Sequence, residues 1–382
     1  MERVLESGAM RSPIGGLLLA LATAPRLLAQ TDPAFQPKSS SNVGFHIDGM
    51  FRQEWTDDIF VSPGVFDSTN RWRLQARPRI EFGGDWFHVG VGAEFNYSKD
   101  DNTDPPPSVL RDNYKSKDAR LDLGWLELKP THWLEVEGGR MFMPIRFTEM
   151  IWDKDLRPQG GSAGLAFHNL GAVRSLSATA LYGQGSSPFD DQHVHMWAFS
   201  ADVVAGGTGS EKSFELTGSY VQWSNLADLQ PNIRRQNTPL VIGAPPFPLA
   251  DDYKVFDLVA RFHDEGKVNT QLVADYCWNT AVDDNRHGLW LALVLGSTQQ
   301  STARLEYTYA KIDKDATLGA YNTDDFFWAT GWEGHRGDLG FRAGPKSSAH
   351  AIASIQRFKD SPILEQRDVW TKRYRLEIRF EY

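Results

Sequence analysis

The last nine residues, Tyr374 to Tyr382, alternate between bulky apolar and charged side chains. Neighbouring residues of a β-strand point to opposite faces, so this pattern gives one apolar face and one charged face. The apolar face contains Tyr374, Leu376, Ile378, Phe380 and Tyr382, and the charged face contains Arg375, Glu377, Arg379 and Glu381. A tilted strand of about nine to eleven residues crosses a lipid bilayer. The stretch therefore predicts a membrane strand with one face toward lipid and the other toward water.

The composition excludes membrane helices and favours a β-barrel. The chain has 382 residues and a mean hydropathy of -0.43, and no run approaches the roughly 18 apolar residues that a membrane helix needs. Averaged hydropathy conceals barrel strands because half of each strand is polar, whereas 13 Trp, 11 Tyr and 22 Phe supply two interfacial aromatic girdles. We predict an all-β fold, a transmembrane up-and-down antiparallel β-barrel of about 16 strands, an even number within the bacterial range.

Charge and motif content exclude several functional classes. The net charge of -9 is opposite to the basic surface that nucleic-acid binding needs. The single cysteine, Cys277, cannot form an intrachain disulfide or a four-cysteine metal site. The sequence contains no nucleophile elbow, zinc-protease motif, nucleotide-binding loop or haem-attachment motif, so we expect no cofactor, no metal and no catalysed reaction. His193 and His195 share a strand face, and a metal ligand pair is the alternative to two rim histidines there.

The amino terminus has the features of a secretory signal. Arg11 precedes a short apolar run, and Leu27-Leu28-Ala29 offers a cleavage site. We expect residues 1–29 to be a signal peptide, residues 30–42 a short periplasmic arm and residues 43–382 an outer-membrane β-barrel.

Long and short links alternate between the expected strands. Long or polar links lie near Pro144–Gly161, Gln184–His193, Ser224–Asp252, Asn279–His287, Ile312–Gly334 and Lys359–Asp368. Short links lie near Gly171, Gly206–Lys212, Asp264–Lys267, Ser297–Ser301 and Gly344–Ser347. An up-and-down barrel needs this alternation because tight turns form one rim and larger loops form the other.

Some places interrupt the regular pattern. Pro78 lacks a ladder donor, which predicts a bulge or a local break. Leu126 and Leu128 change phase within their strand, which predicts another bulge. The Asp-rich and Ser-rich segment Thr56–Thr69 predicts a long first link, and Leu289–Leu295 is apolar on both faces.

The most informative internal stretch runs from Gly139 to Gly161, where a strand pattern stops at Pro144 and a charged loop follows. Its Gly-Arg-x-x-x-Pro and Trp-Asp-x-Asp-Leu elements resemble the porin family of Gram-negative outer-membrane β-barrel proteins, as does the arginine-rich strand Arg71–Arg77. With the closing strand, the likeness covers the first half of the mature chain and its end.

This resemblance implies a barrel for passive diffusion whose third external loop folds inward and narrows the pore. The constriction candidates in that loop are Arg146, Glu149, Asp153, Lys154, Asp155 and Arg157. An ordinary surface loop with a solvated charge cluster is the alternative.

The positions of eight arginines on three neighbouring strands predict a basic wall inside the barrel. Closure places the last strand beside the first and the first beside the second, so one wall would carry Arg52, Arg71, Arg73, Arg77, Arg79, Arg373, Arg375 and Arg379. The acids expected on it are fewer, namely Asp48, Glu54, Glu81, Glu377 and Glu381. A basic wall that faces acids on an inward loop would sort solutes by charge. Cross-strand Arg–Glu pairing is the alternative.

We expect an outer-membrane porin that forms a water-filled channel for small hydrophilic solutes and ions, in contact with outer-membrane lipid and lipopolysaccharide. The likeness to porins implies a homotrimer. A non-conducting or plugged structural barrel is one alternative, which the two-sided apolar run Leu289–Leu295 favours. A barrel-borne hydrolase is another, and it would need a Ser–His pair on an outward face at the rim, where the sequence shows no evident pair.

Overall fold

The computed structural model describes residues 43–100, 118–184, 194–206, 210–226, 253–299, 301–323, 325–326, 329–359 and 367–382. The expected signal peptide and periplasmic arm lie outside the described residues, as do His193 and the central parts of several expected long links.

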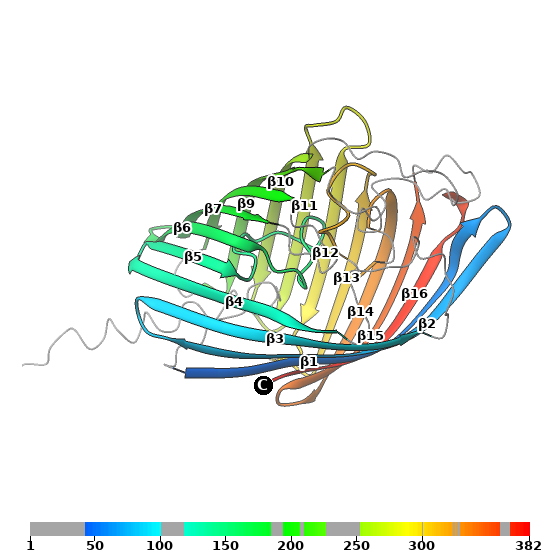
Figure 1. Ribbon diagram of the computed structural model, residues 1–382, viewed down its shortest axis with the longest axis horizontal. Helices are drawn as coiled ribbons and strands as arrows, with labels where there is room; N and C mark the ends of the chain where they lie inside the picture. The colour runs from blue at the N-terminus through cyan, green and yellow to red at the C-terminus, as the bar shows by residue number, and fades with distance from the viewer. Residues whose placement is uncertain are drawn as a thin grey trace, which may run out of the picture.

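The described residues contain sixteen strands that form one closed antiparallel barrel (Figure 1). The strands are β1 (Val43–Ser62), β2 (Val65–Gly83), β3 (Phe87–Asp100), β4 (Asp118–Thr131), β5 (Leu134–Arg140), β6 (Gln159–Leu170), β7 (Val173–Gln184), β8 (His195–Ala205), β9 (Lys212–Ser224), β10 (Tyr253–Asp264), β11 (Thr270–Asn279), β12 (His287–Gly296), β13 (Ala303–Ile312), β14 (Trp332–Gly344), β15 (Ser347–Phe358) and β16 (Thr371–Glu381). Each strand pairs with its neighbours in sequence, and β1 also pairs with β16. The predicted fold class and strand number are confirmed.

Strands β1 and β16 close the barrel along a continuous register. Glu54 of β1 lies opposite Arg375 of β16. At the end of the seam, Tyr382 exchanges two backbone hydrogen bonds with Ile47, with N–O distances of 2.9 and 2.8 Å. The last residue of the chain therefore belongs to the seam, where paired strands satisfy the backbone polar groups.

Side chains alternate between an apolar outer face and a polar interior. On β16, Leu376 and Ile378 are 54% and 51% exposed, whereas Arg375 and Glu377 are each 2% exposed. Apolar residues on the outer faces of other strands are exposed in the same way, including Phe45, Leu74, Ile80, Val91, Phe95, Phe199, Phe214, Leu258, Leu305 and Leu339. A continuous apolar exterior of this kind suits contact with lipid. Among the described residues, no helix combines the length and the apolar character needed to cross a membrane.

The expected first long link is wrong. Strand β1 continues to Ser62 and β2 begins at Val65, so a tight turn joins them and Thr56–Thr69 is mainly a strand hairpin. The register shifts between Thr56 and Ile59, and Asp58 adopts a φ of 58° there. The polar composition of this segment does not oppose strand pairing, because the ladder joins backbone groups.

Both predicted strand irregularities are present, one in β2 and one in β4. The β2–β3 pairing is interrupted between Ala76 and Arg79, on either side of Pro78, and keeps its register. In β4 the register with β3 shifts beside Asp122. This bulge comes before Leu126 and reverses which face the following residues occupy, so Leu126 lies on the exposed outer face. Both predictions are confirmed.

The connections divide the barrel ends into two rims. Short turns follow β2, β4, β6, β8, β10, β12 and β14, and Tyr382 lies at the same end, which we call the short-turn rim. Longer connections follow most of the other strands and define the long-loop rim. Except at the β1–β2 turn, the predicted alternation of long and short links is confirmed.

Candidate functional site

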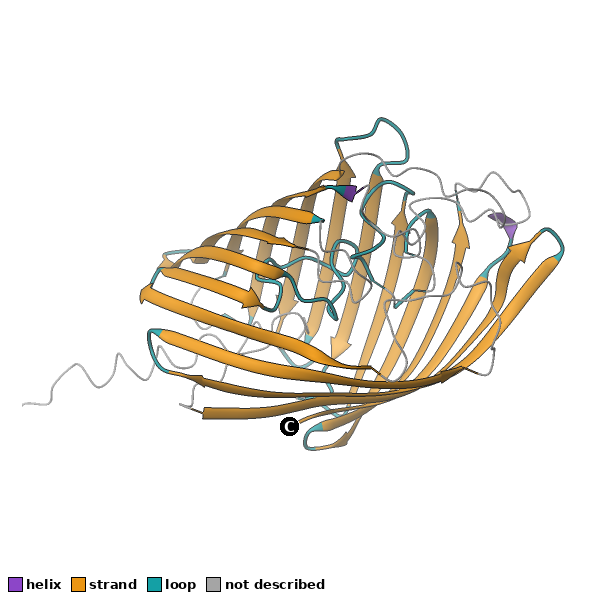
Figure 2. Ribbon diagram, viewed as in Figure 1, coloured by secondary structure: helices purple, strands orange, loops and turns teal. Residues whose placement is uncertain are grey.

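The connection between β5 and β6, residues 141–158, lies inside the barrel (Figure 2). Met141, Met150 and Ile151 are fully buried. At the base of this connection, the backbone N–H of Met141 donates to the carbonyl oxygen of Pro158 at 3.0 Å. We call it the third loop because it is the third connection at the long-loop rim. Its inward position brings its polar side chains against the barrel wall.

Glycine and proline explain why β5 stops and the third loop turns inward. Gly139 has a φ of 120°, and a Cβ atom there would lie 2.2 Å from the carbonyl oxygen of Gly124. Only glycine adopts this backbone without strain. Pro144 has no N–H to continue a ladder. The Gly-Arg-x-x-x-Pro element of the sequence therefore has a direct structural role.

One side of the third loop is attached to β9, β10 and β11. Arg146 Nη1 lies 2.6 Å from Glu215 Oε2. Arg261 Nη1 lies 2.8 Å from the other oxygen of the same carboxylate, and Arg261 Nη2 donates to the carbonyl oxygen of Arg146 at 2.8 Å. Thr148 donates its hydroxyl to Asp275. These contacts involve buried wall residues and fix the position of the loop.

The described residues of a second connection, between β13 and β14, also lie inside the barrel; they are residues 313–323, 325–326 and 329–331. We call it the seventh loop, and its Leu318 and Tyr321 are fully buried. The ring of Trp152 in the third loop stacks on Tyr321, with centroids 5.6 Å apart and planes at 2°. The N–H of Asp153 donates to the carbonyl oxygen of Tyr321 at 2.7 Å. The two inward loops are therefore joined by stacking and by a backbone hydrogen bond.

Five charged residues meet where the two loops touch the wall. Lys154 Nζ lies 2.7 Å from Asp325 Oδ2 and 3.1 Å from Glu149 Oε1. Arg336 Nη1 of β14 lies 3.1 Å from the same Asp325 oxygen and 3.0 Å from Glu149 Oε2. Arg375 Nη1 of β16 lies 2.8 Å from Asp325 Oδ1. We call these five residues the central charge cluster.

The central charge cluster favours the ionised forms of its loop residues. Burial alone would raise the pKa of Asp325, but Lys154, Arg375 and Arg336 hold that pKa well below its usual value. Burial alone would lower the pKa of Lys154, but Asp325 and Glu149 raise it above its ordinary value. Both groups are therefore charged across the neutral pH range.

The remaining constriction candidates also lie in the interior. Asp155 Oδ1 is 2.8 Å from Arg77 Nη1 of β2, and the backbone N–H of Asp155 donates to Asp153 Oδ1 at 2.9 Å. Arg157 donates from Nη1 to the carbonyl oxygen of Lys154 at 2.7 Å. Burial would raise the pKa of Asp155, but Arg77 and Lys154 hold it below its usual value. The third loop thus contacts the arginine-bearing wall as well as β9–β11.

The structure brings the eight wall arginines together on the inner face of β1, β2 and β16. Arg52 lies opposite Arg73 on one side and opposite Glu377 on the other. Acids are interleaved with them. Glu54 Oε1 is 2.7 Å from Arg71 Nη2, and Glu54 Oε2 is 2.8 Å from Arg375 Nε. The wall therefore presents largely compensated charge to the interior.

Acids from outside the predicted wall add to this compensation. Arg77 Nη2 lies 2.9 Å from Glu94 Oε1 of β3, and Arg120 contributes a second cation to the same carboxylate. Glu81, one of the acids expected on the wall, places its Oε1 2.7 Å from Arg79 Nε on the same strand. The same arginines therefore share one wall and also pair with acids, which are the two arrangements that the sequence left open.

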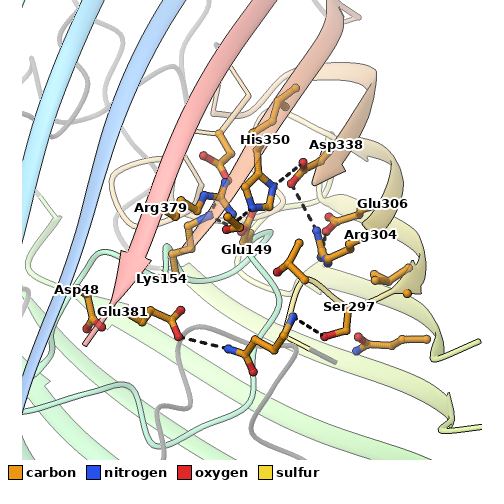
Figure 3. A pocket seen from close by; sticks show the side chains of 18 of the residues that line it. Asp48, Glu149, Lys154, Ser297, Arg304, Glu306, Asp338, His350, Arg379 and Glu381 are labelled. Atoms are coloured by element: carbon orange, nitrogen blue, oxygen red, sulfur yellow. Dashed lines mark hydrogen bonds and ion pairs between the residues drawn. The ribbon is translucent and has the colours of Figure 1, made fainter. Parts of the chain in front are cut away.

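A cavity of about 710 Å³ extends from the inward loops to the short-turn rim (Figure 3). Phe147 and Lys154 line it at the loop end, and Lys346 and Glu381 line it near the rim. We call it the vestibule. The inner face of the two-sided apolar run, Leu289–Leu295, contributes Trp290, Ala292 and Val294 to its lining.

Asp325 and Arg336 were not among the predicted site residues. The sequence indicated only a long link at Ile312–Gly334. This link contains apolar residues that are buried in the structure, including Leu318 and Tyr321. Apolar side chains in a long link are the sequence signal for an inward loop, because a loop that lies in water is usually polar.

One group of acids in the described part of the chain has the spacing of a cation site. Glu127, Glu135 and Glu137 bring their carboxylate oxygens within 4.8 Å of one another. Lys129 Nζ lies 2.8 Å from Glu127 and 3.4 Å from Glu135, so a lysine ammonium compensates this group. On the outer face, His195 Nδ1 lies 3.1 Å from the hydroxyl of Tyr182.

The barrel is similar to solved porin structures. OprB of Pseudomonas putida, in its high-pH structure, matches with a TM-score of 0.56 and 12% identity over 89% of this chain and 94% of that chain. OmpF of Salmonella typhi, in complex with daunomycin, matches with a TM-score of 0.52 and 11% identity over 89% and 97% of the two chains. No protein-family model and no curated protein matches the sequence. The expected resemblance to porins is confirmed at the level of the fold.

Proposed function

We propose that the chain is an outer-membrane porin that forms a water-filled channel for passive diffusion of small hydrophilic solutes and ions. The observation that carries this proposal is an inward third loop inside a closed barrel whose interior is polar. Such a loop narrows a pore without closing the barrel wall, and charged side chains at the narrow point act on passing solutes.

The proposed narrow region lies between the arginine-bearing wall and the third loop. Its loop residues are the six constriction candidates, and the eight wall arginines would line the pore beside them. Arg77 contacts Asp155 and Arg375 contacts Asp325 directly, at 2.8 Å each, so these ion pairs border the narrow region. Solutes would pass beside the pairs, where nearly balanced charge limits net selectivity. We infer a weak ion preference and ready passage of neutral polar solutes.

A plugged structural barrel is the second candidate, and a specific observation supports it. Phe326 of the seventh loop lies edge-on against Trp290 of β12, with ring centroids 5.8 Å apart. The Cζ atom of Arg336 lies 5.6 Å from the centroid of each of these two rings. Together with the central charge cluster, this packing fills part of the interior at the level of the loops.

The location and the assembly are part of the same proposal. The exposed apolar exterior and the expected signal peptide support an outer-membrane position, with outer-membrane lipid and lipopolysaccharide around the barrel. A homotrimer follows from the resemblance to porins. Chemical cross-linking of the detergent-solubilised protein, read on a denaturing gel, checks for trimers.

Liposome swelling tests the channel proposal against the plugged barrel. Proteoliposomes in iso-osmotic solutions of neutral sugars of increasing size should swell at rates that fall steeply with solute size, because a narrow pore excludes the larger sugars. Swelling no faster than in protein-free liposomes for every sugar would support the plugged barrel.

A further inference from the structure

A serine, a histidine and an aspartate form a hydrogen-bonded chain on β14 and β15. Ser348 Oγ lies 2.9 Å from His350 Nε2. His350 Nδ1 lies 2.8 Å from Asp338 Oδ1 (Figure 3). A carboxylate only accepts hydrogen bonds, so His350 Nδ1 donates its proton to Asp338, and in the neutral imidazole the lone pair on Nε2 faces the serine hydroxyl. This is the arrangement in which a histidine can remove a proton from a serine.

The surroundings hold the imidazole in this orientation. His350 lies opposite Gly340, and a Cβ atom at Gly340 would be 2.8 Å from His350 Cε1, so only glycine leaves room for the ring. His350 and Asp338 are each 6% exposed. Arg304 Nη1 lies 3.4 Å from Asp338 Oδ2 and occupies the second oxygen of the carboxylate. His350, the candidate base, is therefore buried, and Asp338 fixes its orientation.

The serine is the accessible member of the chain. Ser348 is half-buried and lines the vestibule. Val294 and Ile352 provide an apolar part of the same lining. Arg379 of β16 lies directly opposite Ser348 in the sheet and also lines the vestibule. A small molecule next to Ser348 would thus meet a nucleophile, an apolar surface and a cation.

We propose that Ser348, His350 and Asp338 form a hydrolytic site for short-chain acyl esters that enter the vestibule, an activity beyond the proposed diffusion channel. Ser348 Oγ attacks the ester carbonyl carbon while its proton passes to His350 Nε2. The alcohol leaves with that proton, and an acyl-serine remains. Water then attacks the acyl-serine, gives a proton to His350 and releases the acid, and His350 returns the proton to Ser348.

Arg379 is the proposed partner of the developing oxyanion. Its guanidinium is held by Glu377, with Nε 2.8 Å from Glu377 Oε2. A fixed positive charge beside the attacked carbonyl stabilises negative charge in the transition state. Asp338 acts through His350 and is a positioning residue.

Labelling with a fluorophosphonate probe tests the nucleophile. The refolded full-length protein should be labelled at Ser348, as shown by peptide mass spectrometry, and prior heat denaturation should abolish the labelling. Ser348→Ala and His350→Gln should each reduce it at least tenfold. Ser347→Ala, a change of the adjacent serine, should leave it unchanged.

Hydrolysis of p-nitrophenyl butyrate provides the second readout. The wild-type protein should hydrolyse this ester, and Arg379→Gln should lower the turnover without preventing probe labelling. Labelling that is equal in wild-type and Ser348→Ala protein, or turnover no higher than that of the His350→Gln variant, would overturn the proposal. Conductance of the same preparations shows separately whether the channel is intact.

Discussion

Lys154 Nζ lies 2.7 Å from Asp325 Oδ2, and the two residues are 171 positions apart in the chain. The contact joins the third loop to the seventh loop inside the barrel. Because Asp325 also contacts Arg336 and Arg375 of the wall, one carboxylate connects both loops to β14 and β16. The position of the proposed constriction therefore depends on this aspartate.

Replacement of Asp325 with Asn should loosen both loops. It leaves Lys154, Arg336 and Arg375 without their shared anion, and removing one partner of a buried ion pair costs about 3 kcal/mol or more of unfolding free energy. We expect a lower melting temperature of the detergent-solubilised protein and noisier single-channel currents. Asp284→Asn in the exposed β11–β12 connection is the matched control. Equal melting temperatures and equal current noise in the two variants would contradict a structural role of Asp325.

The same pair predicts a defined pH dependence. The folded pKa of Asp325 is lowered, so its stabilisation is complete above its unfolded pKa of about 3.9 and is lost as the pH falls through the folded value. The folded pKa of Lys154 is raised, so its stabilisation is complete below about pH 10.4 and is lost as the pH rises through the folded value. The difference in melting temperature between wild-type and Asp325→Asn protein should stay constant from about pH 5 to about pH 9 and shrink below about pH 4. If the difference in melting temperature changed near neutral pH, groups other than Asp325 and Lys154 would be responsible for the pH dependence.

Charge reversal on the arginine wall should change ion selectivity. Arg77 lies between Glu94 and Asp155, so Arg73→Glu combined with Arg77→Glu would make this side of the interior strongly acidic. The reversal potential in a KCl gradient should shift toward cation preference, with the permeability ratio changing roughly twofold or more. Arg357→Glu on the outer face of β15 should cause no shift. An unchanged reversal potential in the double variant would remove the pore-lining role of these arginines.

Gly139→Ala should destabilise the barrel where the third loop begins. The backbone at this position has a φ of 120°, and the added methyl group would meet the carbonyl oxygen of Gly124. Strain of this kind costs about 1–3 kcal/mol before the clash is included. Gly218→Ala on β9, where no atom lies within 4 Å of the new Cβ, should change the melting temperature little. Equal effects of the two substitutions on melting would show that the Gly139 backbone adapts freely.

The fold was largely predictable because barrel strands carry their own signal. Alternation on β16 depends only on which residues meet lipid, so Leu376 and Ile378 on one face and Arg375 on the other could be assigned without a structure. Closure of the barrel then placed Arg52 beside Glu377 and Arg73. The β1–β2 hairpin was missed because the segment Thr56–Thr69 lacks a regular alternation of apolar and polar residues.

The candidate site was predictable only in part. The Gly-Arg-x-x-x-Pro element pointed to the third loop, but the partners of its charges come from distant strands. Nothing local in the sequence joins Lys154 to Asp325, and the contact follows from how two loops fill one interior. Ser348 and His350 lie two residues apart, yet Asp338 reaches them only through the β14–β15 register, so no linear motif marks the three.

Single-channel recording in a planar lipid bilayer tests the central claim most directly. The refolded wild-type protein should insert and give discrete current steps that rise linearly with KCl concentration, with Asp325→Asn steps that are noisier. Inserted protein whose bilayer current stays at the level of the lipid alone, at every voltage and salt concentration, would contradict a water-filled pore between the inward loops and the arginine wall.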